Sequence, residues 1–138
     1  MDKNYWENYY AEVDGVIQPS SFAQYTLSRL PVDYTLVELG CGNGRDSIFF
    51  AQNGFTVHAM DQCASAIALL EGKSSRLFPS VANVACLNIS LPKGSKAIYN
   101  RFLLHALDKE EATNMLTWLG EHLDSGDLFF CECRSVKS

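Results

Sequence analysis

The hydrophobic residues of this chain follow two spacings that alternate along its length. Short runs rich in apolar, β-branched and aromatic residues predict strands at 34–39, 55–60, 81–89, 96–100 and 128–133. Between them, apolar residues three and four positions apart predict helices at 22–30, 45–53, 64–70 and 109–123. Ser20 or Ser21 is placed to cap the first helix, and Pro31 is placed to end it.

Strands that alternate with helices of about ten residues predict βαβ units and a parallel sheet. The chain has 138 residues, which is the length of one domain. We therefore expect an α/β, Rossmann-like, doubly wound domain with at least five mainly parallel strands and helices on both faces. Residues 1–31 are interpreted as an N-terminal helical cap region and residues 32–138 as the core. Ligands of such sheets bind at the carboxyl ends of the strands.

Three glycines follow the first predicted strand with the spacing G-x-G-x-G, at Gly40, Gly42 and Gly44. Glycine tolerates positive φ and lets a ligand approach the backbone closely. Asp61 follows the second predicted strand, seventeen residues after the last of these glycines. A carboxylate at that place can accept hydrogen bonds from both hydroxyls of a ribose. Together the loop and the acid predict a site for a nucleoside-containing cofactor.

The residues around the glycines discriminate among nucleotide cofactors. A dinucleotide site prefers G-x-G-x-x-G, but the third glycine position of that pattern holds Arg45. Glu38, just before the loop, would repel a pyrophosphate but suits a ligand with an ammonium or sulfonium charge. A Walker-type phosphate loop is excluded because no Gly-Lys-Ser/Thr follows. An NAD-type oxidoreductase is therefore the weaker interpretation.

Residues 37–44, Val-Glu-Leu-Gly-Cys-Gly-Asn-Gly, resemble the first motif of the class I S-adenosylmethionine-dependent methyltransferases. Residues 99–107 resemble the motif after the fourth strand in a bacterial subgroup tied to capsule, lipopolysaccharide and other small-molecule biosynthesis. The resemblance covers nearly the whole chain, from the aromatic opening at 5–10 to the ending at 132–135. It implies the strand order 3-2-1-4-5, S-adenosyl-L-methionine as cofactor, and methyl transfer to a small-molecule or sugar/phosphate-type acceptor.

Carried over by position, the resemblance implies cofactor binding by residues after the first four strands and by one N-terminal tyrosine: Glu38, Gly40, Cys41, Gly42, Asn43, Gly44, Asp61, Gln62, Asn88, Ile89, Asn100 and Tyr9. Asn88 stands where the family commonly has an aspartate that accepts the adenine amino group, and an asparagine carbonyl can also accept this bond. No metal site is predicted.

The resemblance places two candidate catalytic residues, Arg101 and His105, at the mouth of the site. They are four residues apart, so we expect them on one face of a short helix. Arg101 would anchor an anion, and His105 would act as a base or hydrogen-bond partner; the alternative is a structural His105. The aromatic N-terminus, with Tyr9, either forms a lid over the cofactor or packs a helix onto the sheet.

The chain departs from the family after the fifth predicted strand, because only five residues follow Cys133. Family members continue with another helix and an antiparallel strand pair, which have no counterpart here. The fifth strand would then be an exposed apolar edge, which natural proteins normally cover. Three explanations are open: a homodimer, a partner chain, or a fragment of a longer protein. The alternative function is a cofactor-binding subunit that is non-catalytic or depends on a partner.

Composition and net charge limit the kinds of partner that we expect for this chain. Hydrophobic residues make up 47% and charged residues 20% of the chain, as in ordinary globular domains. The formal net charge of -5 argues against a dedicated nucleic-acid binder, which needs a basic surface. No apolar run approaches the roughly 18 residues of a membrane span, and the first residues lack the apolar core of a signal peptide. We therefore expect a cytoplasmic protein whose five cysteines are reduced and mostly buried.

Overall fold

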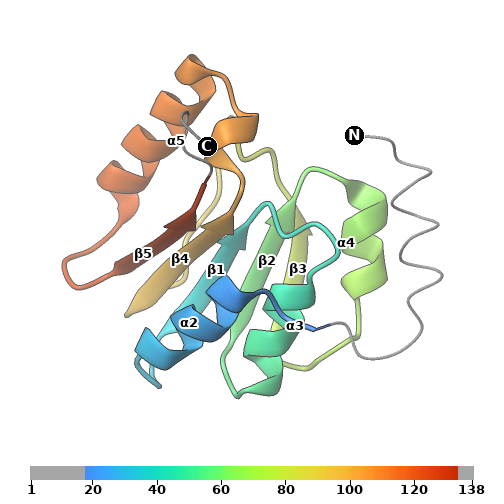
Figure 1. The fold of residues 1–138 in the computed structure, drawn as a ribbon. Coiled ribbons are helices and arrows are strands. Elements are labelled where there is room, and N and C mark those ends of the chain that lie inside the picture. The colour runs from blue at the N-terminus through green and yellow to red at the C-terminus, as the bar shows by residue number, and fades with distance from the viewer. Residues whose placement is uncertain (1–17, 134–138) are drawn as a thin grey trace.

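The structure is a computed structural model that describes residues 18–133, apart from the side chain of His105. Within these residues, five parallel strands form one sheet in the order β3-β2-β1-β4-β5 (Figure 1). The strands are β1 (Thr35–Leu39), β2 (Val57–Asp61), β3 (Leu77–Val81), β4 (Lys96–Arg101) and β5 (Leu128–Glu132). The helices are α2 (Ser21–Arg29), α3 (Arg45–Gln52), α4 (Ala64–Leu70), the 3-10 helix η1 (Leu104–Ala106) and α5 (Lys109–His122). The predicted α/β class and the strand order 3-2-1-4-5 are confirmed.

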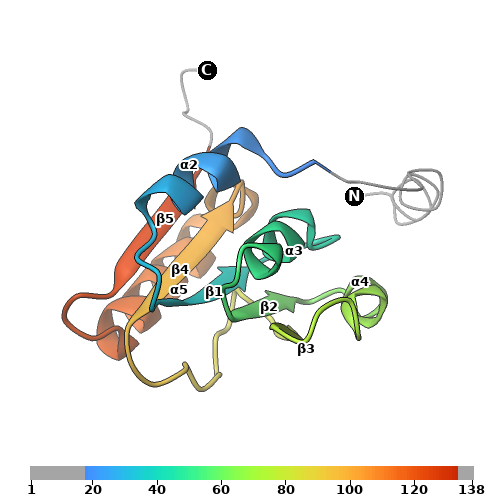
Figure 2. The same cartoon turned by 90° about the horizontal axis from the view of Figure 1, so that it is seen from below.

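Helices cover both faces of the sheet, as predicted. Figures 1 and 2 show α2 and α3 on one face of the sheet and α5 on the other. Side chains of a strand point alternately to the two faces, so the sheet contributes to two separate hydrophobic clusters. The cluster under α2, α3 and α4 includes Leu36, Phe50, Val57, Ile67 and Tyr99, and the cluster under α5 includes Val37, Leu39, Ile98, Met115 and Leu119.

Two of the helices, α2 and α5, begin where a capping side chain accepts a hydrogen bond from a backbone N–H of the first turn. The hydroxyl of Ser20 accepts a hydrogen bond from the N–H of Ala23 at 3.0 Å, so Ser20 caps α2. Asp108 and Glu111 form a reciprocal capping box at the start of α5. The four predicted α-helices agree with the observed ones to within two residues.

The prediction of a third strand at 81–89 is wrong, because β3 spans Leu77–Val81. Pro79 weakens the strand signal of that segment, yet a proline is tolerated in an edge strand, where an N–H facing outward is not needed. The apolar residues after β3 lie in a loop, and Val84 and Ile89 pack into the cluster under α5. They therefore produce an apolar pattern without joining the sheet.

Leu116 of α5 is 46% exposed. The cysteines differ from expectation. Among the five cysteines, Cys41 is buried and the others are partly or fully exposed, since they lie in loops and in β5. The edge position of β5 is as predicted, and Phe129 on it is partly exposed. No helix within residues 18–133 is long and apolar enough to cross a membrane.

A buried ion pair lies at the amino end of the sheet, opposite the glycine loop. Lys96 begins β4 and its side chain is 2% exposed; Nζ lies 2.8 Å from Asp127 Oδ2 and 3.0 Å from Asp124 Oδ2. Burial lowers the pKa of Lys96, but the two carboxylates outweigh burial and raise it above its ordinary value. The Asp127 side chain is buried, whereas that of Asp124 is exposed. The turn before β5 is thus tied to the start of β4 mainly through Asp127.

We predict that Asp127→Ala lowers the free energy of unfolding by about 3 kcal/mol, because it leaves the buried ammonium of Lys96 with only an exposed partner. Asp124→Ala is the matched control and should cost less than about 1 kcal/mol, since an exposed ion pair contributes little. Urea unfolding of the wild type and both variants measures these costs. Equal losses in the two variants would contradict the greater weight given to Asp127.

Candidate functional site

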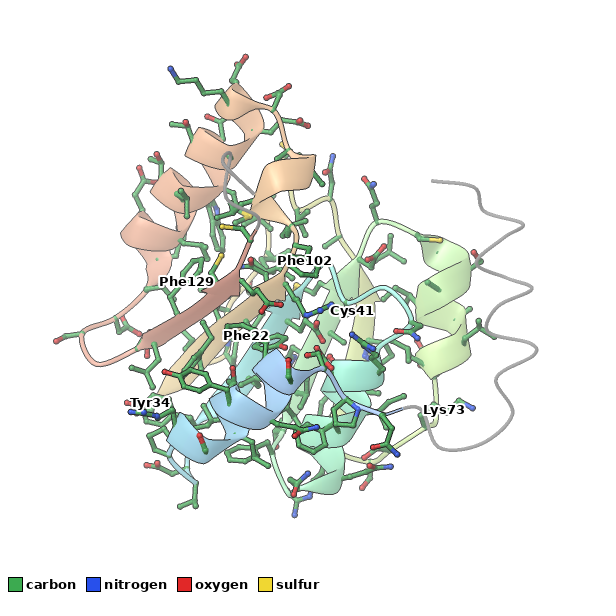
Figure 3. The ribbon with its side chains drawn as sticks, in the orientation of Figure 1. Phe22, Tyr34, Cys41, Lys73, Phe102 and Phe129 are labelled. Carbon is green, nitrogen blue, oxygen red and sulfur yellow. The ribbon has the colours of Figure 1, made fainter. Side chains whose placement is uncertain are left out.

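The loop 40–44 connects β1 to α3 at the carboxyl end of the sheet. Gly40, Gly42 and Gly44 have φ angles of 74°, 55° and 76°, in the left-handed region that residues with a side chain adopt only at a cost. The N–H groups of Gly40 and Cys41 both donate to the carbonyl of Met60, at 2.8 and 2.9 Å. The loop is therefore held against β2. Figure 3 shows Cys41 at this end of the sheet.

The three glycines differ in what surrounds their missing side chains. A Cβ on Gly44 would lie 2.5 Å from Cδ2 of Leu70, and a Cβ on Gly40 would lie 3.2 Å from Cδ1 of Leu103. A Cβ on Gly42 would find open space, with nothing within 4 Å in the part of the chain that is described. Gly44 therefore lets α4 pack against the loop, whereas Gly42 leaves its backbone accessible to a ligand.

Asp61 ends β2 and contacts the glycine loop directly. Its Oδ2 accepts a hydrogen bond from the N–H of Gly42 at 2.9 Å, and its Oδ1 accepts one from the N–H of Cys63 at 2.8 Å. A carboxylate has about four acceptor positions, so both oxygens keep capacity for further donors. The structure brings the predicted ribose acid to the loop, with Gln62 exposed beside it. Their roles in cofactor binding stay predictions.

Glu38 is a buried carboxyl directly below the glycine loop. It is 4% exposed and accepts a hydrogen bond from the hydroxyl of Ser47 in α3. Burial raises the pKa of Glu38 to about 8; Ser47 opposes this shift, Asp46 and Asp61 add to it, and Arg45 opposes it. The carboxyl is therefore largely protonated at neutral pH, and a positive ligand group nearby would favour its ionised form.

The two other residues of the loop have local structural roles. Cys41 is 7% exposed, and burial raises the pKa of its thiol well above the ordinary value, so this cysteine is a poor nucleophile. The side-chain carbonyl of Asn43 accepts a hydrogen bond from the N–H of Arg45 at 3.2 Å, which helps to start α3. Both residues lie in the loop as predicted, and their contact with a cofactor stays a prediction.

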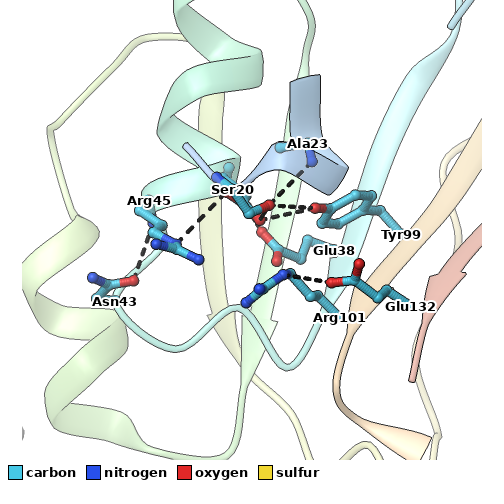
Figure 4. A network of polar contacts seen from close by, with 10 residues as sticks. Ser20, Ala23, Glu38, Asn43, Arg45, Tyr99, Arg101 and Glu132 are labelled. Carbon is cyan, nitrogen blue, oxygen red and sulfur yellow. Dashed lines mark hydrogen bonds and ion pairs between the residues drawn. The ribbon is translucent and has the colours of Figure 1, made fainter. Parts of the chain in front are cut away.

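A polar network behind the loop was not among the sequence-based candidates. Asp46, in the first turn of α3, is 4% exposed and accepts hydrogen bonds from the N–H and the hydroxyl of Ser20, both at 2.8 Å. The hydroxyl of Tyr99 in β4 donates to the same carboxylate at 2.8 Å. Figure 4 shows Tyr99 beside Ser20. An acidic residue in a first helical turn was the available signal, but it does not reveal partners this distant in sequence.

The end of β4 carries two of the predicted site residues. Asn100 is fully buried, and neither its side-chain oxygen nor its nitrogen finds a hydrogen-bond partner among the described residues. The Nε of Arg101 lies 2.7 Å from Oε1 of Glu132 in β5 (Figure 4). Its guanidinium stacks over the ring of Phe102, with 4.1 Å to the centroid. A ligand can supply the hydrogen bonds that such a buried amide lacks.

The structure contradicts two predicted placements, and two further predicted site groups lie outside the described residues. Arg101 is the last residue of β4 and η1 begins only at Leu104, so Arg101 and His105 do not share the face of one helix. Asn88 is not at the end of the third strand; it is exposed in the loop after β3, while Ile89 packs against the cluster under α5. Tyr9 and the side chain of His105 lie outside the described residues.

Within the residues described, no group of three or more His, Cys, Asp or Glu side chains could hold a metal ion. The chemical capacity of the site therefore rests on its glycine loop and on the buried polar groups around it. These groups offer a carboxylate acceptor at Asp61, a buried carboxyl group at Glu38, an amide at Asn100 without a partner among the described residues, and an open backbone at Gly42. Such a set suits a ligand with hydroxyl donors and a positive charge.

Comparison with protein families identifies the relatives of this chain. The profile of the family described as tellurite resistance protein TehB matches residues 5–127. The chain belongs to the TehB family. No similar protein was found among the curated proteins compared by sequence.

Several solved structures share the fold. The glycopeptide N-methyltransferase MtfA, complexed with (S)-adenosyl-L-homocysteine, is 20% identical, with a TM-score of 0.70 over 87% of this chain and 51% of its own. The CcbJ methyltransferase from Streptomyces caelestis is 21% identical, with a TM-score of 0.70 over 90% and 53%. The TehB-like SAM-dependent methyltransferase from Corynebacterium glutamicum is 17% identical, with a TM-score of 0.71 over 90% and 66%.

These likenesses confirm the fold that the sequence resemblance implies, which is that of the S-adenosylmethionine-dependent methyltransferases. The chain spans 51–66% of the length of these three proteins. Its own activity, substrate and partners therefore have to be argued from its site.

We predict that Gly44→Ala destabilises the domain by about 2–4 kcal/mol, because it combines left-handed backbone strain with a collision against Leu70. Gly42→Ala is the matched control: it has similar backbone strain but open space, so it should cost only about 1–2 kcal/mol. Urea unfolding measures both. Adding Leu70→Ala to Gly44→Ala should recover part of the extra loss of stability, because it removes the collision. If stability does not recover, the collision with Leu70 is not the cause.

We predict that Glu38 makes the domain less stable as pH rises. Its folded-state pKa of about 8 lies above the unfolded value of 4.5, so the folded state binds more protons between these values and stability falls from about pH 4.5 to 8. Glu38→Gln keeps an acceptor for Ser47 and should remove this loss, which amounts to the order of 4 kcal/mol. Urea unfolding at pH 5 and pH 8.5 tests this; a difference between the two proteins that is independent of pH would contradict it.

Proposed function

We propose that this chain binds S-adenosyl-L-methionine at the carboxyl ends of β1, β2 and β4 and transfers its methyl group to a small molecule. The observation that carries the proposal is the contact between Asp61 and the N–H of Gly42, which joins the predicted ribose acid to a glycine loop with an open face. Support also comes from solved structures of the same fold, whose names describe methyltransferases complexed with adenosyl ligands.

The residues present fit this cofactor. Asp61 keeps acceptor capacity for the two ribose hydroxyls, and the open backbone at Gly42 allows close approach. Glu38 offers a carboxylate whose ionisation a positive amino-acid group would favour. The unpartnered amide of Asn100 supplies one donor group and one acceptor at the end of β4. When bound, the sulfonium compound supplies an activated methyl group.

The chain itself would contribute position and charge. Arg101, held by Glu132 and stacked on Phe102, keeps further N–H groups with which it can orient an anionic acceptor. His105 follows as the candidate base for a neutral acceptor such as a hydroxyl; an anionic acceptor needs no base. Positioning the acceptor near the methyl donor contributes about 7–11 kcal/mol when the geometry is close to that of the reaction.

The acceptor that we propose is a small metabolite, including sugar and phosphate types, in a bacterial cytoplasm. The acidic composition favours such an acceptor over nucleic acid. The name of MtfA describes a glycopeptide acceptor, and the family description refers to tellurite, so both classes belong in an acceptor screen. Gln62, exposed beside Asp61, would lie near the adenine.

A second candidate function is a cofactor-binding subunit that transfers no methyl group alone. One observation favours it: within residues 18–133, β5 is an edge strand with a partly exposed Phe129. A homodimer or a partner chain on β5 would complete the site in that case. Light scattering with a labelled-methyl assay separates the two functions, because turnover by the isolated chain would exclude the second.

Calorimetry with S-adenosyl-L-methionine and with NAD tests the proposed cofactor. We expect saturable binding of S-adenosyl-L-methionine and none of NAD, because Arg45 stands where a dinucleotide site has its third glycine. A labelled-methyl assay with small hydroxyl, phosphate, glycopeptide and oxyanion acceptors then tests transfer. Binding of NAD without binding of the sulfonium compound would overturn the proposal.

We predict that Asp61→Ala weakens binding of S-adenosyl-L-methionine by about 1.5–3 kcal/mol, the range for hydrogen bonds to a charged group. Asp124→Ala, at the opposite end of the sheet, is the control and should leave affinity unchanged. Calorimetry on both variants, with circular dichroism to verify folding, measures the effect. Unchanged affinity in a folded Asp61→Ala protein would place the ribose elsewhere.

A further inference from the structure

The carboxylate of Asp46 joins three elements that surround the proposed cofactor site. It lies in the first turn of α3, directly after the glycine loop, and receives two hydrogen bonds from Ser20 and one from Tyr99. Ser20 caps α2, and Tyr99 lies in β4 next to Asn100. Figure 4 shows Ser20 and Tyr99 meeting at this point. One side chain thus connects the loop, a covering helix and the end of a central strand.

This connection is strong because Asp46 is almost fully buried. A buried carboxylate is costly unless donors compensate its charge, and here three hydrogen bonds, the amino end of α3 and the Nε of Arg45 at 3.8 Å do so. Movement of Ser20 or Tyr99 away from Asp46 would leave this charge undercompensated. The network therefore holds its members in one arrangement.

The glycine loop depends on this network for the position of α3. Gly44 is the N-cap residue of α3 and has no side chain with which to cap it. The first turn of α3 is therefore tied to the rest of the domain by the side chains of Asp46 and Ser47, which contact Ser20 and Glu38 respectively. A shift of this turn would also shift the backbone at Gly44.

The end of β4 depends on the same network through Tyr99. The ring of Tyr99 lies between Phe22 of α2 and Phe50 of α3, with centroid distances of 5.4 and 5.1 Å. Burial raises the pKa of the Tyr99 hydroxyl above its ordinary value, so the hydroxyl remains a donor to Asp46 at physiological pH. The next residue is Asn100, whose buried amide lacks a partner among the described residues.

Asp46 also acts on Glu38 through its charge. The charged groups that influence Glu38 are Asp46 and Asp61, which disfavour its ionisation, and Arg45, which favours it. Removal of the charge at position 46 should therefore make Glu38 easier to ionise. This electrostatic coupling gives the network a measurable signature that differs from simple loss of stability.

We propose that Asp46 is a positioning residue for the cofactor: its hydrogen bonds to Ser20 and Tyr99 hold the glycine loop and the end of β4 in the arrangement that binds the ligand. The inference rests on the proposed binding of S-adenosyl-L-methionine. Asp46 itself lies behind the loop and acts through its neighbours rather than by contact with the ligand.

The test compares Tyr99→Phe and Asp46→Asn with Asp127→Asn, a substitution of a buried aspartate in the ion pair at the other end of the sheet. Calorimetry measures the affinity for S-adenosyl-L-methionine from pH 6 to 9, and urea unfolding measures stability. We expect Tyr99→Phe to weaken binding about ten-fold, which corresponds to 1.4 kcal/mol. The midpoint of the pH dependence of the affinity, which reflects the ionisation of Glu38, should be retained. Asp46→Asn should weaken binding similarly at its most favourable pH and move the midpoint to lower pH.

Asp127→Asn should lower stability without changing the affinity or the pH midpoint. If folded Tyr99→Phe and Asp46→Asn bind as the wild type does at every pH, Asp46 has only a structural role and the inference is overturned. If Asp46→Asn does not fold, Tyr99→Phe decides, because it removes a single hydroxyl. If the wild type itself does not bind S-adenosyl-L-methionine, the proposed function fails and this inference fails with it.

Discussion

The reversal of the chain between β1 and α3 is the constraint on which the rest of the site depends. Three residues in this loop adopt left-handed backbone angles, and each would cost about 1–2 kcal/mol with a side chain present. The loop is further held by the carbonyl of Met60 and the carboxylate of Asp61, both at the end of β2. Since β1 lies between β2 and β4, the loop sits where the strand order reverses, which is where open α/β sheets bind ligands.

The buried polar groups at the two ends of the sheet differ in how well they are paired. At the amino end, Lys96 is fully paired with carboxylates, and the pair stabilises the turn before β5. At the carboxyl end, Glu38 is held in its protonated form by burial and the amide of Asn100 has no partner among residues 18–133. Folding into this arrangement is costly, and a ligand that satisfies these groups would recover part of the cost. The asymmetry supports a binding site at the carboxyl end on physical grounds alone.

Tertiary contacts also determine how the covering helices take part in the site. The helix α2 is amphipathic and needs only its cap and its apolar side to form, yet its first residues are fixed by a buried acid in another helix. The same acid contacts β4, so the helices on one face and the central strands are held as one unit. Rigid support of this kind is what a binding loop requires, because a flexible loop would lose more conformational entropy on binding.

The amino-acid sequence by itself determined the features that short-range physics controls. The glycine loop, a serine cap at Ser20 or Ser21 and the four α-helices depend on residues within one or two turns of each other, and all were predictable. The strand at Leu77–Val81 was not predictable, because Pro79 opposes a strand locally and only pairing with β2 establishes it. The partners of Asp46 lie 26 and 53 residues away, and Glu132 lies 31 residues beyond Arg101, so only the folded sheet decides these contacts.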